Sequence, residues 1–400
     1  MPLEGIKVVD VSEHGFVPSA AATLADWGAD VVKVEKPAGD ALRSIMKNGL
    51  VDDAGDFDFT VEIANRNKRG VSIDLKHAEG RALLDRLIGG ADVFITNQLP
   101  KVLRKLRLEA DDVFAVNPGI VYARGHGQGQ QGPEAEDGGF DAVSYWARAG
   151  IAHMLTPEGA ENVVGSRPAL GDHPSGAQLA GAIAAALVKS LRTGTGVKVD
   201  LSLLAGGVWA LGPDLAFTSY MGNEPPKRRD DRRVSSPLVG GYRTSDQRHL
   251  QLVMLNDDLY WPRTCRALGL DELIDDARYD TQEKRIANNR ELRERLQAVL
   301  GANPLSHWKE RLRAEDCIFS NYASPAEVLE DPQVLSNGYL PEHPTIAGAR
   351  LPATPAQFDD QPIEIRRPAP GIGEHTDEVL TEIGLSASEI EKLRSTGAVR

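Results

Sequence analysis

Short apolar runs rich in valine and isoleucine alternate with amphipathic or small-residue segments in the first third of the chain. The runs predict buried β-strands at residues 6–11, 31–35, 71–75, 93–96 and 120–123. Helices are predicted between them, at residues 18–27 and 78–88 and in a short basic segment after Asn97. Strands that alternate with helices form a parallel sheet covered on both faces. The expected fold class is therefore α/β.

A parallel sheet of this kind binds ligands in the crevice beyond the carboxyl ends of its strands. The predicted strands are followed by polar or glycine-bearing segments that would border this crevice, at residues 12–18, 36–40, 97–101 and 124–132. We expect the functional site to be built from these four segments.

The second half of the chain has a different pattern. A polar, proline-bearing stretch at 223–233 predicts a solvated linker, and two strands are expected within 241–253. Helices are expected through residues 257–314, and a closing helix at 386–395 with a cap at Ser386 or Ser388. These patterns predict a large domain, a small domain with its linker and a final segment, at residues 1–222, 223–325 and 326–400.

Composition narrows the function classes. A chain of 400 residues suits two domains, and a formal net charge of −13 argues against nucleic acid or an anionic membrane as the main partner. The two cysteines, Cys265 and Cys317, form no disulfide framework and have no partners at metal-ligand spacing. The N-terminus lacks signal-peptide features, and the longest apolar run, 179–188, is too short to span a bilayer. We expect a cytoplasmic protein.

The most informative stretch is Ala169–Gly176, in which Asp172 lies in a glycine-bounded turn before a long small-residue helix. Ser175 and Gln178 match a capping box, which predicts that the helix runs from Ser175 to about Leu191. Asp172 would then lie just outside a helix N-terminus, where the macrodipole favours the ionised carboxylate. Such a residue suits covalent catalysis, although the motif taken alone favours a simple capping role for Asp172.

Other candidate motifs are weaker. Residues 127–132 match the dinucleotide fingerprint GxGxxG, but an acidic segment follows instead of a helix, so a flexible lid is favoured over a nicotinamide site. The histidines show no metal-binding spacing. His173 neighbours Asp172 in sequence, but adjacent residues in a turn usually point apart. Residues 374–377 are expected to cap the helix that follows them.

Basic residues gather around the predicted crevice in an otherwise acidic chain. Lys36 ends a strand, Lys76 closes the segment 73–76, and Arg104 and Lys105 follow the strand that ends at Thr96. Each alone is expected to be a solvated surface residue. Together they indicate a pocket for a phosphorylated ligand.

Six motifs in order resemble those of family III (CaiB/BaiF-type) CoA-transferases over nearly the full length. They lie at residues 2–10, 24–35, 67–76, 132–141, 171–176 and 373–377. The resemblance implies a large Rossmann-like parallel-sheet domain, a smaller α+β domain, a C-terminal segment that returns to the large domain, and an interlocked homodimer. It implies an acyl-CoA and a small carboxylic acid as partners, with coenzyme A as substrate and product and no permanently bound cofactor.

The resemblance also implies roles for individual residues. Asp172 would attack an acyl-CoA thioester, giving first an aspartyl anhydride and then an aspartyl-CoA thioester. The residues that would contact CoA are Gly15, Phe16, Lys36, Ile73, Leu75, Lys76, Asn97, Gln98, Arg104, Lys105, Phe140 and Asp141. Arg124, Arg229 and Tyr242 are candidates for binding the acceptor carboxylate.

The sequence departs from the family at several positions. Formyl-CoA transferases have Gln where this chain has Gly15, and a longer glycine loop than Gly240-Gly241, which argues against formyl-CoA and oxalate as substrates. Lys36 replaces an Arg that meets a CoA phosphate. A 2-methylacyl-CoA racemase of the same family is the main alternative, but Phe140 stands where those enzymes have His. A non-catalytic CoA-ester binding protein is a second alternative.

Overall fold

The computed structural model describes residues 1–51, 54–226 and 236–400. The predicted linker residues from 227 to 233, and with them Arg229, lie outside the described part. The described chain forms two compact units. The first unit contains Met1–Thr156, Glu161–Pro226 and Pro332–Arg400, and the second contains Pro157–Ala160 and the described residues from 236 to 331.

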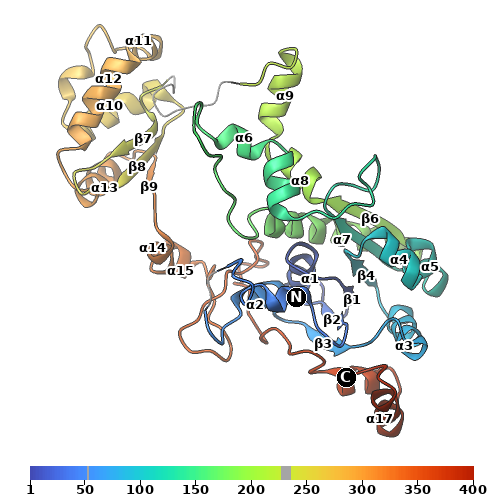
Figure 1. Cartoon of the computed structure of the whole chain (residues 1–400). Helices are drawn as coiled ribbons and strands as arrows, with labels where there is room; N and C mark the ends of the chain where they lie inside the picture. The colour runs from blue at the N-terminus through green and yellow to red at the C-terminus, as the bar shows by residue number, and fades with distance from the viewer. Residues whose placement is uncertain (52–53, 227–235) are drawn as a thin grey trace. The chain divides into compact units, whose positions relative to one another are not determined.

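A six-stranded parallel sheet forms the centre of the first unit, with the strand order β3-β2-β1-β4-β5-β6 (Figure 1). Its strands are β1 (Lys7–Val11), β2 (Asp30–Glu35), β3 (Arg69–Ser72), β4 (Val93–Thr96), β5 (Val121–His126) and β6 (Val197–Ser202). The five predicted strands are confirmed, although β3 begins and ends earlier than expected. The sixth strand, β6, was not among the predicted strands.

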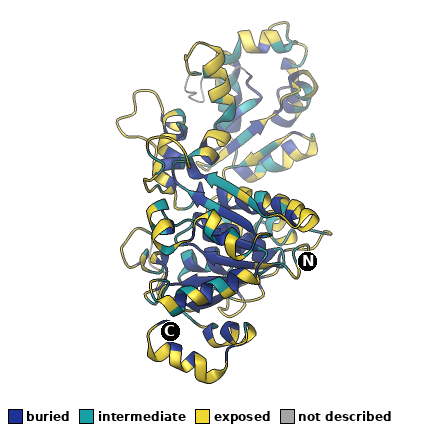
Figure 2. Cartoon of the chain, turned by 90° about the vertical axis from the view of Figure 1, so that its right-hand side faces the viewer, coloured by how far each residue is buried: buried dark blue, intermediate teal, exposed yellow. Residues whose placement is uncertain are grey.

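Alternate side chains of the strands β1, β2, β4 and β5 enter two separate cores, as the two-residue repeat of a strand requires. Val9 on β1 packs with the helices at residues 78–89 and 110–116 and with the C-terminal helices, whereas its neighbour Val8 packs with the helices at residues 16–26 and 172–193. These four strands are therefore buried on both faces (Figure 2). This explains why they read as continuous apolar runs.

The helical segments of the first unit cover this sheet and border its ends. They are α1 (Phe16–Asp26), the 3-10 turn η1 (Ala41–Ser44), α2 (Phe59–Asn65), α3 (Ala78–Gly89), α4 (Pro100–Leu106), α5 (Ala110–Val116), the π-helix η2 (Asp141–Arg148), α6 (Ile151–Leu155), α7 (Asp172–Thr193), α8 (Leu203–Ala210), α9 (Gly212–Tyr220), α15 (Pro332–Ser336), α16 (Thr376–Glu382) and α17 (Ala387–Ser395). Of the described helices, none is long and apolar enough to cross a membrane.

Small residues let α1 and α7 pack closely. A Cβ atom added to Gly176 on α7 would lie 2.1 Å from the Ser19 hydroxyl and 2.9 Å from the Phe16 carbonyl oxygen on α1. Alanines at positions 20, 21 and 180 line the same contact. The helices therefore approach nearly backbone to backbone, and this approach brings the start of α7 to the start of α1.

The C-terminal segment returns to the first unit, as predicted. The His375 N–H donates to the Gly70 carbonyl over 2.9 Å, and the Ser72 N–H donates to the Thr376 hydroxyl over 3.2 Å. Residues 374–377 thus dock beside β3 as well as starting α16. Ser386 caps α17 through a capping box with Glu389, as expected.

The second unit contains a three-stranded antiparallel sheet, β7-β8-β9. Its strands are β7 (Val239–Arg243), β8 (His249–Val253) and β9 (Phe319–Asn321), and its helical segments are α10 (Asp257–Leu268), the 3-10 turn η4 (Asp271–Leu273), α11 (Gln282–Ala287), α12 (Asn289–Leu300), α13 (Leu305–Ala314) and α14 (Pro325–Leu329). The predicted pair of strands and the helical stretch are confirmed, and β9 was not predicted. Trp261, Tyr279 and Trp308 are buried in its core.

Candidate active site

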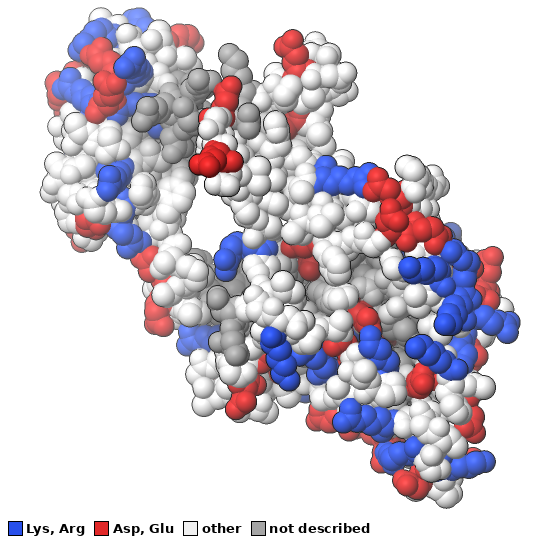
Figure 3. Space-filling model, in the orientation of Figure 1, with Lys and Arg blue, Asp and Glu red and all other residues white. Residues whose placement is uncertain are grey.

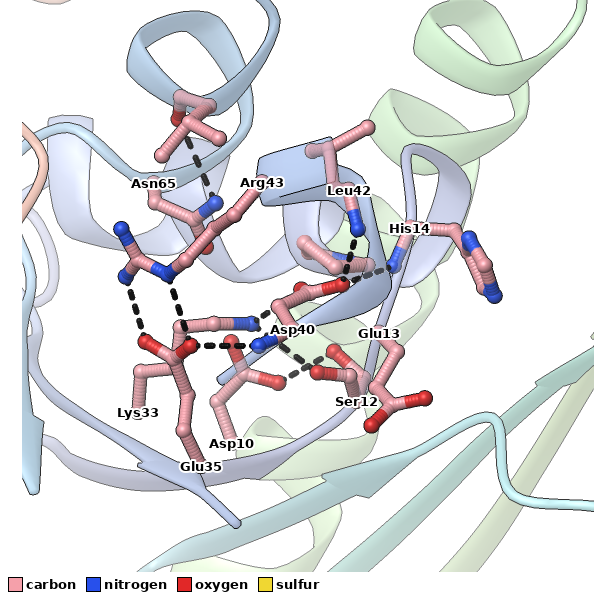
Figure 4. A network of polar contacts seen from close by, with 12 residues as sticks. Asp10, Ser12, Glu13, His14, Lys33, Glu35, Asp40, Leu42, Arg43 and Asn65 are labelled. Atoms are coloured by element: carbon pink, nitrogen blue, oxygen red, sulfur yellow. Dashed lines mark hydrogen bonds and ion pairs between the residues drawn. The ribbon is translucent and has the colours of Figure 1, made fainter. Parts of the chain in front are cut away.

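Buried charges hold the loop that leaves β1. Lys33 on β2 contacts Asp40 over 2.9 Å, and both side chains are inaccessible to solvent. Lys33 also donates to the Ser12 carbonyl oxygen over 2.9 Å, and Asp40 accepts the His14 N–H over 3.0 Å (Figure 4). Burial by itself raises the pKa of Asp40, but Lys33 and the N–H groups of His14 and Leu42 outweigh burial, so the pKa is lowered.

A second buried pair lies beside the first. Lys68 contacts Asp10 on β1 over 2.9 Å and also donates to the Pro18 carbonyl oxygen at the start of α1. Asp10 accepts in addition from the Ser12 hydroxyl. Burial lowers the pKa of Lys68 to about 8. The two pairs tie the segment from Ser12 to Pro18 to β1 and β2, which fixes the position of Gly15 within it.

Gly15 is the point at which Asp172 meets this loop. A Cβ atom added to Gly15 would lie 2.4 Å from Oδ2 of Asp172, so the carboxyl group rests directly against the glycine backbone. Side chains larger than hydrogen would displace it. Asp172 itself lies in the first turn of α7, which packs on α1 behind it.

The start of α7 differs from the sequence expectation in two respects. The helix begins at Asp172, not at Ser175, and no hydrogen-bond partner within the described chain reaches the buried Ser175 hydroxyl, so the predicted capping box is wrong. Instead, Asp141 at the start of η2 accepts the Gly171 N–H over 3.0 Å. A carboxylate thirty residues earlier in the chain therefore accepts a hydrogen bond from a free backbone N–H group at this helix end.

The protonation of Asp172 also differs from the expectation. Burial first, and the charge of nearby Asp141 second, raise the pKa of Asp172 to about 7. The helix dipole was expected to favour the ionised form, but loss of water and a like charge outweigh it. Burial lowers the pKa of the adjacent His173 to about 4, so that imidazole is neutral at pH 7.

A cavity of about 520 Å³ opens in front of Asp172. Three of the four predicted loops border it: those after β1, β4 and β5. The segment 36–40 does not. Seven of the predicted site residues line the cavity, namely Gly15, Phe16, Asn97, Gln98, Arg104, Phe140 and Asp172.

The other predicted site residues lie outside this cavity. Asp141 is buried where it accepts the Gly171 N–H at the start of α7, and Ile73 is buried beside Val399. Lys76 and Lys105 are exposed, and Leu75 is half-buried. Lys36 is exposed and contacts Glu13, a cavity residue, over 2.6 Å.

Basic residues border the cavity on two sides. Arg104 forms a two-point contact with Glu136, at 2.9 and 2.7 Å, where basic side chains gather over α4 (Figure 3). On β5 and β6, Asp200 contacts Arg124 over 3.0 Å, His126 over 3.4 Å and Lys198 over 3.7 Å. Lys198 was missed because β6 was missed, although its alternation of apolar and polar residues over 197–202 is a strand signal.

The acceptor candidate Tyr242 does not line this cavity. It is buried in the core of the second unit, where its hydroxyl donates to the Pro237 carbonyl oxygen over 2.5 Å. Arg124 is a cavity residue, as the sequence suggested.

The fold agrees with comparisons to known proteins. The sequence model of CoA-transferase family III matches residues 3–376. The chain is 31% identical to (R)-2-hydroxy-4-methylpentanoate CoA-transferase of Clostridioides difficile over the full length of both. It is 30% identical to succinyl-CoA:glutarate CoA-transferase of Mus musculus, over 100% of this chain and 90% of that protein.

The solved structure of a CaiB/BaiF family protein from Brucella suis is also similar. It has 28% sequence identity and a TM-score of 0.81, over 96% of this chain and 99% of that one. The chain therefore belongs to CoA-transferase family III, and it is an enzyme of the CoA-transferase class. The resemblance found in the sequence is confirmed, and the racemase alternative is not favoured.

The raised pKa of Asp172 predicts a pH-dependent effect on stability. Between about pH 4 and pH 7 the native carboxyl keeps a proton that the unfolded chain releases, so this group costs stability as the pH rises through that window. We expect Asp172→Asn to be more stable than the wild type by about 2 kcal/mol at pH 8, with no gain at pH 3.5. Urea unfolding at the two pH values measures this difference.

Asp275→Asn, which changes an exposed carboxylate, is the matched control and should show no such pH-dependent gain. A gain for Asp172→Asn of equal size at both pH values would contradict the raised pKa.

Proposed function

We propose that this enzyme transfers CoA from an acyl-CoA thioester to an acceptor carboxylic acid through covalent intermediates on Asp172. The observation that carries the proposal is the position of the Asp172 carboxyl group. It opens into the cavity, rests against Gly15 at a helix start, and has a pKa of about 7. Close to neutral pH it is partly ionised while keeping the basicity that a good nucleophile needs.

The proposed reaction has two symmetrical halves. An Asp172 carboxylate oxygen attacks the thioester carbonyl carbon, the C–S bond breaks, and CoA leaves as a thiolate, giving an aspartyl anhydride. The thiolate then attacks the aspartyl carbonyl, which releases the donor acid as a carboxylate and leaves aspartyl-CoA thioester. The acceptor carboxylate reverses both steps and leaves as its CoA ester. No external oxidant or reductant is needed.

The partners follow from this scheme. Coenzyme A enters and leaves with the substrates and is not a permanent cofactor, and the acids are small enough for a cavity of about 520 Å³. The named relatives act on hydroxy acids and dicarboxylic acids, and we propose acids of comparable size for this chain. Two buried, unpaired cysteines suit a reducing compartment, which supports a cytoplasmic location.

We propose that the first unit binds CoA, with the ADP portion of CoA reaching the basic residues outside the cavity. Arg104 lines the cavity, and Lys36, Lys76 and Lys105 offer exposed point charges. The segment of Ile73 and Leu75 adjoins Lys76. Lysine at position 36 keeps the positive charge that the family uses there but not the two-point geometry of arginine.

This assignment predicts a salt-dependent loss of affinity. Single substitutions Lys36→Ala, Lys76→Ala and Lys105→Ala should each weaken CoA binding several-fold, because each removes one phosphate contact. They should also flatten the dependence of the affinity on salt. Calorimetric titration with CoA at two salt concentrations measures both. Lys189→Ala, at an exposed lysine on α7, is the control, and unchanged affinity in all three variants would exclude these residues as phosphate ligands.

We also propose that two chains form the interlocked homodimer expected of the family. Helices α8 and α9 support the proposal because they expose large apolar side chains, among them Trp209 at 77% and Tyr220 at 88% of their possible surface. Apolar surface of this kind marks a protein interface.

Interlocked chains separate only if they unfold, so the dimer should persist on dilution. We expect mass photometry at nanomolar concentration to give the mass of two chains. Incubation at that concentration for a day should not change the result. A reversible shift to folded monomer would contradict the interlocked arrangement.

The nucleophile assignment predicts a trappable intermediate. After incubation with an acyl-CoA, hydroxylamine should convert Asp172 to a hydroxamate, visible by mass spectrometry of its peptide. Asp172→Ala and Asp172→Asn should lose transfer while CoA still binds, since neither side chain supplies a carboxylate. In the wild type, kcat/KM should rise with pH through about 7 as the carboxyl ionises.

Asp141 is a useful comparison, since it caps α7 and makes no bond to substrate in this scheme; labelling of Asp141 instead of Asp172 would overturn the assignment. Exchange of the α-proton with deuterated water, with no covalent adduct, would instead indicate the racemase reaction.

A further inference from the structure

His14 is held in an unusual backbone conformation beside the proposed nucleophile. Its φ angle is +69°, in the left-handed region that residues other than glycine seldom adopt. The buried Asp40 carboxylate accepts its N–H over 3.0 Å, and Asp40 is held in turn by Lys33. The surrounding buried charges therefore fix a strained residue, which is a common feature of functional sites.

This backbone conformation directs the His14 ring away from the charge network. Figure 4 shows the imidazole on the opposite side of the backbone from the Asp40 carboxylate. His14 lines the same cavity as Asp172, and its ring meets Phe140 edge to face at 5.2 Å between centroids. Within the described chain, no hydrogen bond to either ring nitrogen is found.

The proposed transfer chemistry has no use for this imidazole. The Asp172 carboxylate is the nucleophile and CoA thiolate the leaving group, and neither step needs a second proton carrier. Yet His14 precedes Gly15, against which the Asp172 carboxyl rests. An acyl group bonded to Asp172 would therefore place its substituents next to the part of the cavity wall that His14 and Phe140 form.

We propose that His14 is a specificity-determining residue that hydrogen-bonds an oxygen substituent of the acid, either a hydroxyl or a second carboxylate. An unsubstituted alkyl chain in the same place would strip water from the ring nitrogens without replacing its hydrogen bonds, which penalises that substrate. Phe140 supplies the apolar side of the wall. This inference rests on the proposed function, because it assumes that the acyl group is held at Asp172.

The test compares three thioesters of one chain length on the whole protein: butyryl-CoA, 2-hydroxybutyryl-CoA and succinyl-CoA. Calorimetry gives the affinity for each, and transfer to labelled acetate gives kcat/KM. We expect the wild type to favour at least one oxygen-bearing thioester over butyryl-CoA by tenfold or more. A preference for 2-hydroxybutyryl-CoA would indicate that His14 binds a hydroxyl group, and a preference for succinyl-CoA would indicate that it binds a carboxylate.

His14→Gly removes the imidazole and suits the positive φ, so the chain should fold. It should reduce the preference at least tenfold, and His14→Gln, which keeps a hydrogen-bonding group, should restore part of it. His153→Leu, at an exposed histidine on α6, is the control and should keep the wild-type ratio. A wild type without the preference, or an unchanged ratio in His14→Gly, would overturn the inference.

Failure of the proposed function would look different. If the wild type binds the three thioesters but passes no CoA to labelled acetate or other acids, the transfer scheme is wrong, while the affinity ratios still decide the role of His14. If transfer proceeds and the ratios do not depend on His14, only the inference about His14 fails.

Discussion

The buried pairs Lys33–Asp40 and Lys68–Asp10 are the constraint on which the site depends. Removing one charge from such a pair leaves its partner uncompensated in a medium that solvates it poorly. Both pairs also bind backbone atoms of the segment that joins β1 to α1: Lys33 the Ser12 carbonyl, and Lys68 the Pro18 carbonyl. Lys33 and Lys68 must stay paired with their carboxylates because they are buried, and the same two side chains fix the loop between Ser12 and Pro18.

Close helix packing makes the second half of the site. Gly176 allows α7 to approach α1, and Gly15 allows the Asp172 carboxyl to reach the loop. These two glycines have ordinary backbone angles, so their role is space and not conformational freedom. The long small-residue helix, which the sequence made conspicuous, is explained by this contact, since larger side chains would hold Asp172 away from the loop after β1.

The predictable parts of the structure are those that local pattern controls. The strand at Val93–Thr96 was located without error because its residues face two apolar cores and the polar residues Asp92 and Asn97 flank it. The start of α7 was misplaced because Ser175 offers a local cap, whereas the actual cap comes from Asp141, far away in sequence. The pKa of Asp172 was misjudged for the same reason, since burial and a distant carboxylate depend on tertiary structure. Lys198 was missed because half-buried β6 lacks a strong apolar run.

Asp141 links the stability of the site to its chemistry. Its carboxylate satisfies the N–H of Gly171, which stabilises the start of α7 and so places Asp172. The same negative charge adds to burial in raising the pKa of Asp172. A neutral cap such as asparagine would hold the helix equally well but would leave the pKa of Asp172 lower. Because Asp141 is an acid, helix capping is coupled to the basicity of the Asp172 carboxylate in the cavity. The two like charges repel each other, and the surrounding packing must overcome this repulsion.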